Sequence, residues 1–553
     1  METRMDVTDV ISTQESVGRK AVKVLYPLFM GQFFGLVLTA ATFIIVTRLL
    51  GPADYGIYVF AFGFSTLVNG VAAFGVGAYF NSELAGLAYR KDGSSMLHVV
   101  NSGYIIAGAV GIALSLLGIA LSAGIAGFFP KVGITPLTLM LTSAQIFFYM
   151  ISMVAVNGLV GLSRSGLAAI TNIVVDIIQL ALSIALTVMY GVNGAVAAML
   201  IGYAVGAVFG TALLARALAR YIKPRVILPA MEHLRKTFSF VWPIAANNFL
   251  NTGMANFSIL FLGLFVFAAA IGNYGAANRG LTLVAMLYGT FGQGMLNTFT
   301  TARSMKKAGE VNKTYNDIMR FSLIFMLPVV VFVGVMATPS LYLLISSNYA
   351  SAPLYLMLMC IGTTIGLFGS NISNLLISSS HTKSVLFINM VSAAVQFVLI
   401  LALVPGMYAA GASDIYMVGT AIITIYFVGN AVELFMFVRE AGRKLGLRID
   451  ARSNIMLYAV NALLGISLVA WLAVSSSLLQ GVGMHDIAYV AELAGAVAIC
   501  VVAYPALLVA LRAVSGNDMK DLREATAKLG VISAVMGLFL DYSGYLHRKL
   551  ASA

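Results

Sequence analysis

The sequence predicts an all-α polytopic membrane protein with about fourteen transmembrane helices, arranged as two six-helix lobes followed by two further helices. Three observations predict this class. Of the 553 residues, 60% are hydrophobic and only 10% are charged, whereas soluble domains carry about a quarter charged residues. Apolar runs of helix-spanning length recur without the period-two alternation of a membrane barrel. Similar residues also recur about 216 positions apart.

Fourteen apolar runs are long enough to cross roughly 30 Å of hydrocarbon as helices. They cover residues 24–47, 57–81, 99–127, 136–161, 165–190, 193–215, 238–267, 273–301, 318–346, 352–380, 383–404, 414–438, 455–479 and 486–512. We therefore expect an N-lobe at 24–215, a C-lobe at 238–438 and two appended spans at 455–512.

Polar segments separate these parts. Residues 1–23 are expected to form a polar arm that carries both acidic and basic residues. A secretory signal begins instead with a positively charged region, so the arm is not predicted to be one. The basic segment 216–237, broken by Pro224 and Pro229, is the expected linker between the lobes. In the tail 513–553, apolar residues at helical spacing alternate with Lys and Arg, which predicts an amphipathic helix on the membrane surface.

The distribution of Lys and Arg predicts the orientation. With the N-terminus in the cytoplasm, 30 of the 33 basic residues fall on the cytoplasmic side, and only Arg48, Lys131 and Arg279 do not. Cytoplasmic loops carry such an excess, so both termini are expected in the cytoplasm. The net charge of +12 is then a topology signal rather than a sign of an anionic partner, and no nucleic acid is expected to bind.

Sequence signals of enzymatic chemistry are absent. There is no GxxxxGK[ST] or HExxH motif, and the five histidines are scattered singly. The two cysteines, Cys360 and Cys500, lie inside apolar runs, and the outer loops are short. We therefore predict no catalytic residues, no metal site and a transporter rather than an enzyme.

Five pairs of residues repeat at nearly one separation. Tyr26-Pro27 matches Trp242-Pro243, Tyr55-Gly56 matches Tyr274-Gly275, and Asn172, Gln179 and Gly194 match Asn389, Gln396 and Gly411. An even number of spans in each repeat predicts parallel lobes related by a pseudo-two-fold axis along the membrane normal, the architecture of alternating-access transporters.

Several motifs resemble one superfamily in their order along the chain. The run Leu50 to Gly56 (LGPADYG) is similar to the LGPxxYG turn of polysaccharide flippases in the MOP (multidrug/oligosaccharidyl-lipid/polysaccharide) superfamily. The segments Phe74–Gly77, Tyr190–Ala198 and Asn273–Arg279 resemble the end of its span 2 and the starts of its spans 6 and 8. The chain is thus identified by resemblance as a MATE/MOP-like polysaccharide transporter.

The resemblance implies a flippase of the cell membrane. Such a protein moves a polyprenyl-(pyro)phosphate-linked oligosaccharide from the inner to the outer leaflet for polysaccharide or glycan export. It implies no cofactor beyond a coupling H+ or Na+. The implied partners are the lipid-linked substrate, membrane lipids and polysaccharide-assembly proteins around a monomeric transporter. Two alternatives stay open: a MATE-like small-molecule or cation antiporter, and a flippase for the peptidoglycan lipid precursor.

Two sets of polar residues inside the spans are candidate sites. Asn172, Asp176 and Gln179 form one helical stripe, with Asp176 near the midplane, where a carboxylate is costly. It could take up a coupling ion, or equally be a buried carboxyl that sets helix packing. The candidate sugar and phosphate contacts are Gln32, Asn247, Asn248, Asn251, Arg279, Gln293 and Asn297. Amides inside membrane helices also act as plain interhelical contacts.

Overall fold

The computed structural model describes residues 7–72, 76–90, 92–222, 256–285, 308–379, 381–479, 485–511 and 513. Within these residues every regular element is helical. The chain divides into two compact units, Met1–Gly272 and Asn273–Ala553.

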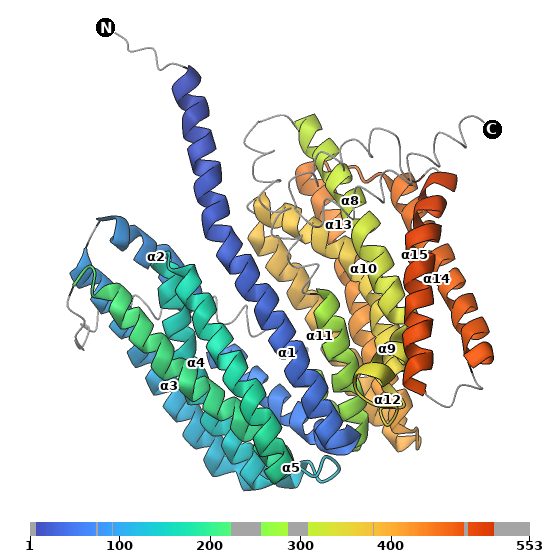
Figure 1. Ribbon diagram of the computed structural model, residues 1–553, viewed down its shortest axis with the longest axis horizontal. Helices are drawn as coiled ribbons and strands as arrows, with labels where there is room; N and C mark the ends of the chain where they lie inside the picture. The colour runs from blue at the N-terminus through green and yellow to red at the C-terminus, as the bar shows by residue number, and fades with distance from the viewer. Residues whose placement is uncertain are drawn as a thin grey trace. The chain divides into compact units, whose positions relative to one another are not determined.

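The first unit is a bundle of long helices (Figure 1). It contains α1 (Val7–Ala72), α2 (Val76–Arg90), α3 (Gly93–Phe128), α4 (Pro136–Gly161) and α5 (Ser165–Leu218), followed by a helical stretch at 256–262. Both α1 and α5 are two helices joined at a glycine with positive φ, 72° at Gly51 and 57° at Gly191. These glycines lie between predicted spans 1 and 2 and spans 5 and 6, where only glycine adopts such a conformation at little cost.

The second unit opens with the rest of a helical stretch at 268–285. It continues with α8 (Ala308–Val335), α9 (Ala337–Leu344), α10 (Ala352–Ser378), α11 (Thr382–Ala409), α12 (Asp414–Ile422), the π-helix η1 (Ile423–Gly429), α13 (Asn430–Leu445), α14 (Ala451–Leu479) and α15 (His485–Ala510). Predicted span 9 is thus divided between α8 and α9, and predicted span 12 among α12, η1 and α13. The appended helices α14 and α15 lie side by side in this unit (Figure 1).

In the described residues, ten helices are long and apolar enough to cross a membrane. This confirms the all-α membrane class. Two of these ten helices each contain two predicted spans, which meet at Gly51 in one helix and at Gly191 in the other. Predicted spans 7 and 8, the tail 513–553 and most of the linker 216–237 lie largely outside the described residues. The count of fourteen and the lobe boundaries therefore stay predictions. Helix α1 begins at Val7, within the segment predicted as an arm.

Local capping starts two helices of the first unit. The carboxylate of Asp92 accepts hydrogen bonds from the Ser95 backbone N–H (3.0 Å) and hydroxyl (2.6 Å), and these bonds lower the pKa of Asp92. Thr135 caps α4 by accepting a bond from the backbone N–H of Thr138 at 3.2 Å. Both residues satisfy backbone donors that the first helical turn leaves unpaired.

Small residues allow the helices to approach closely. A methyl group added at Gly56 would collide with the carbonyl oxygen of Ala268, and one added at Gly272 would collide with the carbonyl oxygen of Pro52. Gly56 and Gly272 lie 216 residues apart, as do Pro52 and Ala268. Such close crossings are typical of membrane helices.

Two asparagines hold the connection between α13 and α14. Asn312 of α8 donates to the Gly446 carbonyl (3.4 Å) and accepts from the Arg448 N–H (3.1 Å). One turn later, Asn316 donates to the Arg448 carbonyl and accepts from the Asp450 N–H, both at 3.0 Å. The two side chains thus satisfy backbone groups of the irregular segment 446–450 that no helix would pair.

Candidate functional site

The predicted stripe of α5 is a real face of its first helix. Asn172 is exposed, whereas Asp176 and Gln179 are half-buried. The helical spacing that predicted the stripe is observed, since 165–190 is continuous helix. The structure therefore brings Asp176 and Gln179 together inside the first unit.

Asp176 lies directly against α1. A methyl group added at Gly35 would sit 3.3 Å from Oδ2 of Asp176. Among the described residues, no side chain or backbone donor makes a hydrogen bond to this carboxylate. A carboxylate so placed needs a proton, a cation or a polar group to offset the cost of its desolvation.

Gln179 packs where the two helices of α5 face each other. A methyl group at Gly202 would lie 3.0 Å from Nε2 of Gln179, so only glycine leaves room for the amide. The amide approaches the hydroxyl of Tyr203. Its Nε2 is nevertheless buried without a hydrogen bond of good geometry among the described residues. A buried donor left without a partner costs roughly 1–3 kcal/mol.

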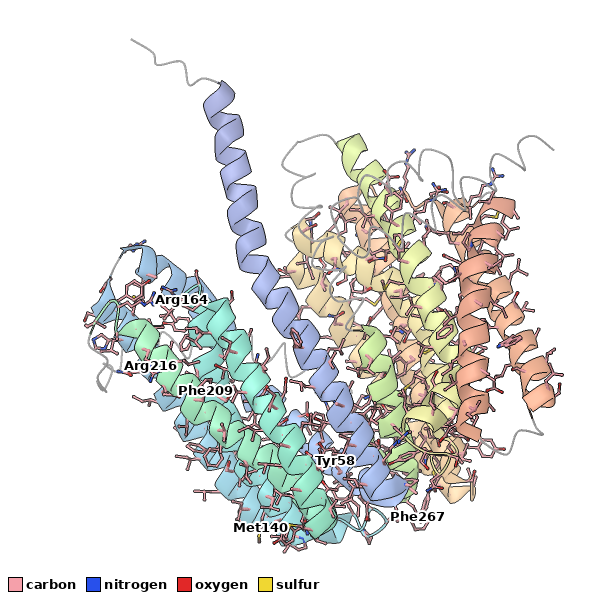
Figure 2. The ribbon with its side chains drawn as sticks, viewed as in Figure 1. Tyr58, Met140, Arg164, Phe209, Arg216 and Phe267 are labelled. Carbon is pink, nitrogen blue, oxygen red and sulfur yellow. The ribbon has the colours of Figure 1, made fainter. Side chains whose placement is uncertain are left out.

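Three tyrosines complete this polar cluster. The ring of Tyr203 meets that of Tyr149 on α4 edge to face, with centroids 5.1 Å apart and an interplanar angle of 87°. Tyr58, on the second helix of α1 (Figure 2), and Asp176 both lie within electrostatic reach of the Tyr203 hydroxyl. The sequence analysis missed all three tyrosines, because a tyrosine inside an apolar run is an ordinary core residue until its neighbours are known.

The repeat-related helix α11 is arranged differently. Gln396, the counterpart of Gln179, donates from Nε2 to Ser392 Oγ at 3.0 Å. Ser392 in turn donates to the carbonyl of Gly429 at 3.1 Å. Gln396 also packs on Gly429, because a methyl group there would lie 2.7 Å from its Cδ. These bonds link the stripe to η1, and Ser392 also lies against the carboxylate of Glu433 on α13.

The predicted sugar and phosphate contacts are mostly untested by the structure. Asn247, Asn248, Asn251, Gln293 and Asn297 lie outside the described residues, as does the side chain of Gln32. Arg279 is half-buried in the helix 268–285 and is not a free cation. Its neighbour Asn278 accepts a hydrogen bond from the Tyr426 hydroxyl at 3.2 Å. These assignments stay predictions.

Lys131 is one of the three basic residues that do not fall on the predicted cytoplasmic side, and its contacts explain its position. Lys131 donates from Nζ to the carbonyl of Phe265 at 2.7 Å and lies 5.4 Å from the centroid of the Phe267 ring. A cation placed at free carbonyls and over an aromatic face is stabilised there. Lys131 therefore has a structural role in the first unit.

Another structural residue went unnoticed in the sequence. Asn273 Oδ1 accepts from the backbone N–H groups of Ser351 (3.1 Å) and Ala352 (3.0 Å), at the start of α10. It caps a helix almost eighty positions away, a role that no local pattern signals.

The predicted sidedness of the basic residues stays a prediction. Figure 2 shows Arg164 and Arg216 at one end of this unit and Met140 at the other. In the described residues, no three His, Cys, Asp or Glu side chains gather in a way that could hold a metal ion.

Comparisons with known proteins identify the family and the fold. The family described as "Polysaccharide biosynthesis protein" matches residues 45–354, more than half of the chain. The search of curated proteins found no match to this chain.

Among solved structures, the chain is similar to the lipid II flippase MurJ in an inward closed conformation, with 14% identity and a TM-score of 0.68 over 88% of this chain and 99% of that one. It is similar to an inward-facing multidrug resistance MATE family transporter of the MOP superfamily, with 14% identity and a TM-score of 0.62 over 74% and 95% of the two chains. A MOP superfamily transporter from Pyrococcus furiosus matches with 15% identity and a TM-score of 0.53 over 77% and 95%. These likenesses establish a MOP-type transporter fold.

Proposed function

Because this chain belongs to the polysaccharide biosynthesis protein family, we propose that it is a flippase for lipid-linked oligosaccharide. It would carry a polyprenyl-(pyro)phosphate-linked glycan from the inner to the outer leaflet by alternating access, with both termini in the cytoplasm. The family match and the MOP-type fold support this proposal together.

Physical chemistry explains why such a substrate needs a protein. A sugar hydroxyl transferred into hydrocarbon without a partner costs on the order of a few kcal/mol, so a glycan cannot cross unaided. A transporter offers a hydrated polar path for the head group while the lipid tail stays in the bilayer. We assign the predicted amides Gln32, Asn247, Asn248, Asn251, Gln293 and Asn297 to this path, with Arg279 near the phosphate.

The observation that carries the coupling step is the apposition of Asp176 and Gly35. A half-buried carboxylate without a hydrogen-bond donor among the described residues lies beside an unpartnered amide and the tyrosine cluster. We assign Asp176 as the group that takes up the coupling proton or Na+. The corresponding helix α11 has Ala393 in place of this carboxylate, so the assignment concerns the first unit only.

Two alternatives concern the substrate. The MurJ structure covers 88% of this chain and the MATE structure 74%, so the likeness to a lipid-linked-substrate transporter extends further. This supports a lipid-linked substrate over a small-molecule antiporter. Lipid II, which the name of the MurJ structure specifies, is the substrate of the second candidate, a flippase for the peptidoglycan lipid precursor. Polysaccharide-assembly proteins are the partners we expect, acting on a monomeric transporter.

The test is transport by the purified full chain in proteoliposomes. Lipid-linked oligosaccharide and lipid II, each carrying a fluorophore on the head group, are placed in the inner leaflet, and their arrival outside is measured by quenching. We expect transport of the oligosaccharide, and preferential transport of lipid II would overturn the substrate assignment.

Asp176→Asn should lower the transport rate by about tenfold or more, equivalent to about 1.4 kcal/mol in a barrier, with unchanged abundance in the membrane. The matched control is Asp486→Asn, since Asp486 is an exposed carboxylate at the start of α15. If transport and abundance fall together in Asp176→Asn, the residue serves packing and the coupling assignment is wrong.

A further inference from the structure

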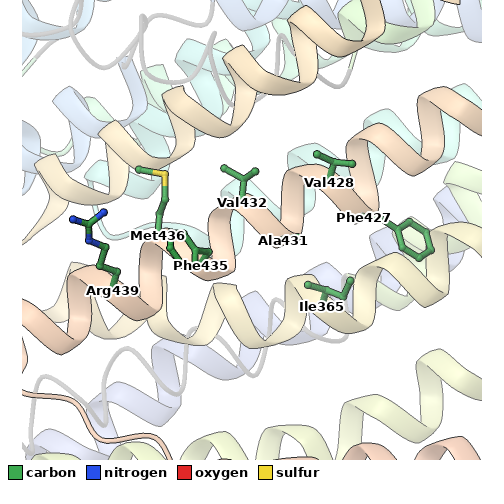
Figure 3. A pocket seen from close by; sticks show the side chains of 8 residues that line it. All are labelled: Ile365, Phe427, Val428, Ala431, Val432, Phe435, Met436 and Arg439. Carbon is green, nitrogen blue, oxygen red and sulfur yellow. The ribbon is translucent and has the colours of Figure 1, made fainter. Parts of the chain in front are cut away.

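An apolar groove runs along the second unit beside the seam between α10 and α13 (Figure 3). Its wall extends from Phe427 of η1 to Met436 of α13, with Ile365 of α10 on the facing side, and its volume is about 790 Å³. Every residue that lines it is apolar except Arg439 at one end.

The walls of the groove are held firmly. At the η1 end, a methyl group on Gly362 would lie 2.8 Å from the Tyr426 carbonyl oxygen, so the two backbones are in direct contact. Asn430 donates to the Gly362 carbonyl at 3.0 Å. Further along, a methyl group on Gly369 would lie 3.8 Å from the backbone of Leu434. These contacts fix the spacing between α10 and the η1–α13 segment, which carry the residues that line the groove.

The arginine end opens into a basic recess. A second cavity of about 350 Å³ shares Met436 and Arg439 with the groove and adds Lys383 and Arg443. Its one acidic residue, Glu440, is paired with Lys444 at 2.8 Å. Within the part of the chain that the structure describes, neither Lys383, Arg439 nor Arg443 has an ion-pair partner within 4 Å. The recess thus has the charge to hold a phosphate group.

The dimensions fit one leaflet of a membrane. From Phe427 to Arg439 the helix rises by about 18 Å, and half of a hydrocarbon core of about 30 Å is about 15 Å. An acyl chain of a phospholipid spans one leaflet, whereas a polyprenyl tail is much longer than the groove. Basic residues at the end of such a groove attract anionic head groups.

We propose that the groove and the basic recess together bind one anionic phospholipid. One acyl chain lies along Phe427 to Met436, and the phosphate contacts Lys383, Arg439 and Arg443. This site is separate from the Asp176 cluster and does not depend on the proposed transport function.

The test is lipid binding to the purified, delipidated full chain, measured by native mass spectrometry. The chain is titrated with dioleoyl phosphatidylglycerol or dioleoyl phosphatidylcholine. We expect one tightly bound phosphatidylglycerol per chain and about tenfold or more weaker binding in Lys383→Ala/Arg439→Ala. Ala431→Trp, which fills the groove, should weaken it similarly without changing the charge.

Two variants serve as matched controls. Arg216→Ala removes an exposed arginine from the first unit, and Ala473→Trp adds the same ring to an exposed position of α14. Both should bind phosphatidylglycerol as the unmodified chain does. Equal binding in all variants would overturn the proposal, as would displacement of phosphatidylglycerol by polyprenyl phosphate at equal or lower concentration, which would assign the groove to the substrate. If Ala431→Trp fails to fold, the double alanine variant still decides the outcome.

Discussion

Helices α5 and α11 correspond to each other in the repeat predicted from the sequence, yet their polar stripes differ in what surrounds them. Each has an asparagine and a glutamine at the same separation of 217 residues, Asn172 and Gln179 against Asn389 and Gln396. In both repeats the glutamine packs on a glycine of the following helix, Gly202 or Gly429. Gly202 and Gly429 lie 227 residues apart rather than 217, so this contact does not follow the separation of the predicted repeat.

The difference lies in the residues between the two amides. In α11, Ser392 links Gln396 to the Gly429 carbonyl, and its counterpart in α5 is Val175, which has no polar group. Asp176 in α5 stands where α11 has Ala393. In α11 the amide of Gln396 is bonded through Ser392, whereas in α5 the amide of Gln179 has no bond of good geometry among the described residues and lies on the same face as Asp176. The comparison thus separates a packing stripe from a candidate site without any functional data.

The largest effect on stability is expected when the carboxylate of Asp176 is copied to the corresponding position of α11, Ala393. Ala393→Asp introduces a carboxylate into a helix whose neighbouring polar groups are already bonded to each other, at a cost of about 3 kcal/mol for a charge at membrane depth. We expect a marked loss of folded protein in the membrane and a lower midpoint of thermal unfolding. The control is Ala393→Ser, which adds a polar group without charge. Normal abundance of Ala393→Asp would show that the two sites tolerate a carboxylate equally.

A smaller effect should distinguish the two glutamines. Gln396→Leu breaks the bond to Ser392 and should lower the free energy of unfolding by about 1 kcal/mol, with transport per folded molecule unchanged. Gln179→Leu removes a buried donor that has no good partner, so stability should stay the same or rise while transport falls. Thermal unfolding and proteoliposome transport are measured on both variants. Equal loss of stability in the two would mean that both stripes serve packing.

The smallest effect concerns a carboxylate outside both helices. The bonds from Ser95 hold the pKa of Asp92 below its ordinary value, so its contribution to stability is present above the unfolded-state pKa and is lost as pH falls through the lower, folded-state pKa. Asp92→Asn should remove this weak acid-dependent term from thermal unfolding. It should leave any pH dependence of transport unchanged. That dependence would then come from other titratable groups, such as Asp176. A changed transport profile in Asp92→Asn would contradict this assignment.

Most helices were predictable because hydrophobic runs and glycine turns act locally. The spans around Gly51 and Gly191, the starts of α4 and α5 and the stripe of Asn172, Asp176 and Gln179 all follow from residue order alone. The break between α8 and α9 at Met336 and the π-helix within predicted span 12 were missed, because hydropathy does not mark a change of helix geometry inside a continuous apolar run.

The sequence by itself determined the membrane class and the spacing that puts Asp176 and Gln179 on one face, because apolar content and helical periodicity are properties of neighbouring residues. Only the tertiary structure decided which polar groups have partners. Gly35 meets Asp176, Lys131 meets Phe265 and Asn273 caps α10, and each contact joins segments tens to more than a hundred positions apart. Such pairings depend on how helices pack, since hydrogen bonds and desolvation are set by the atoms within a few ångströms and not by distance along the chain.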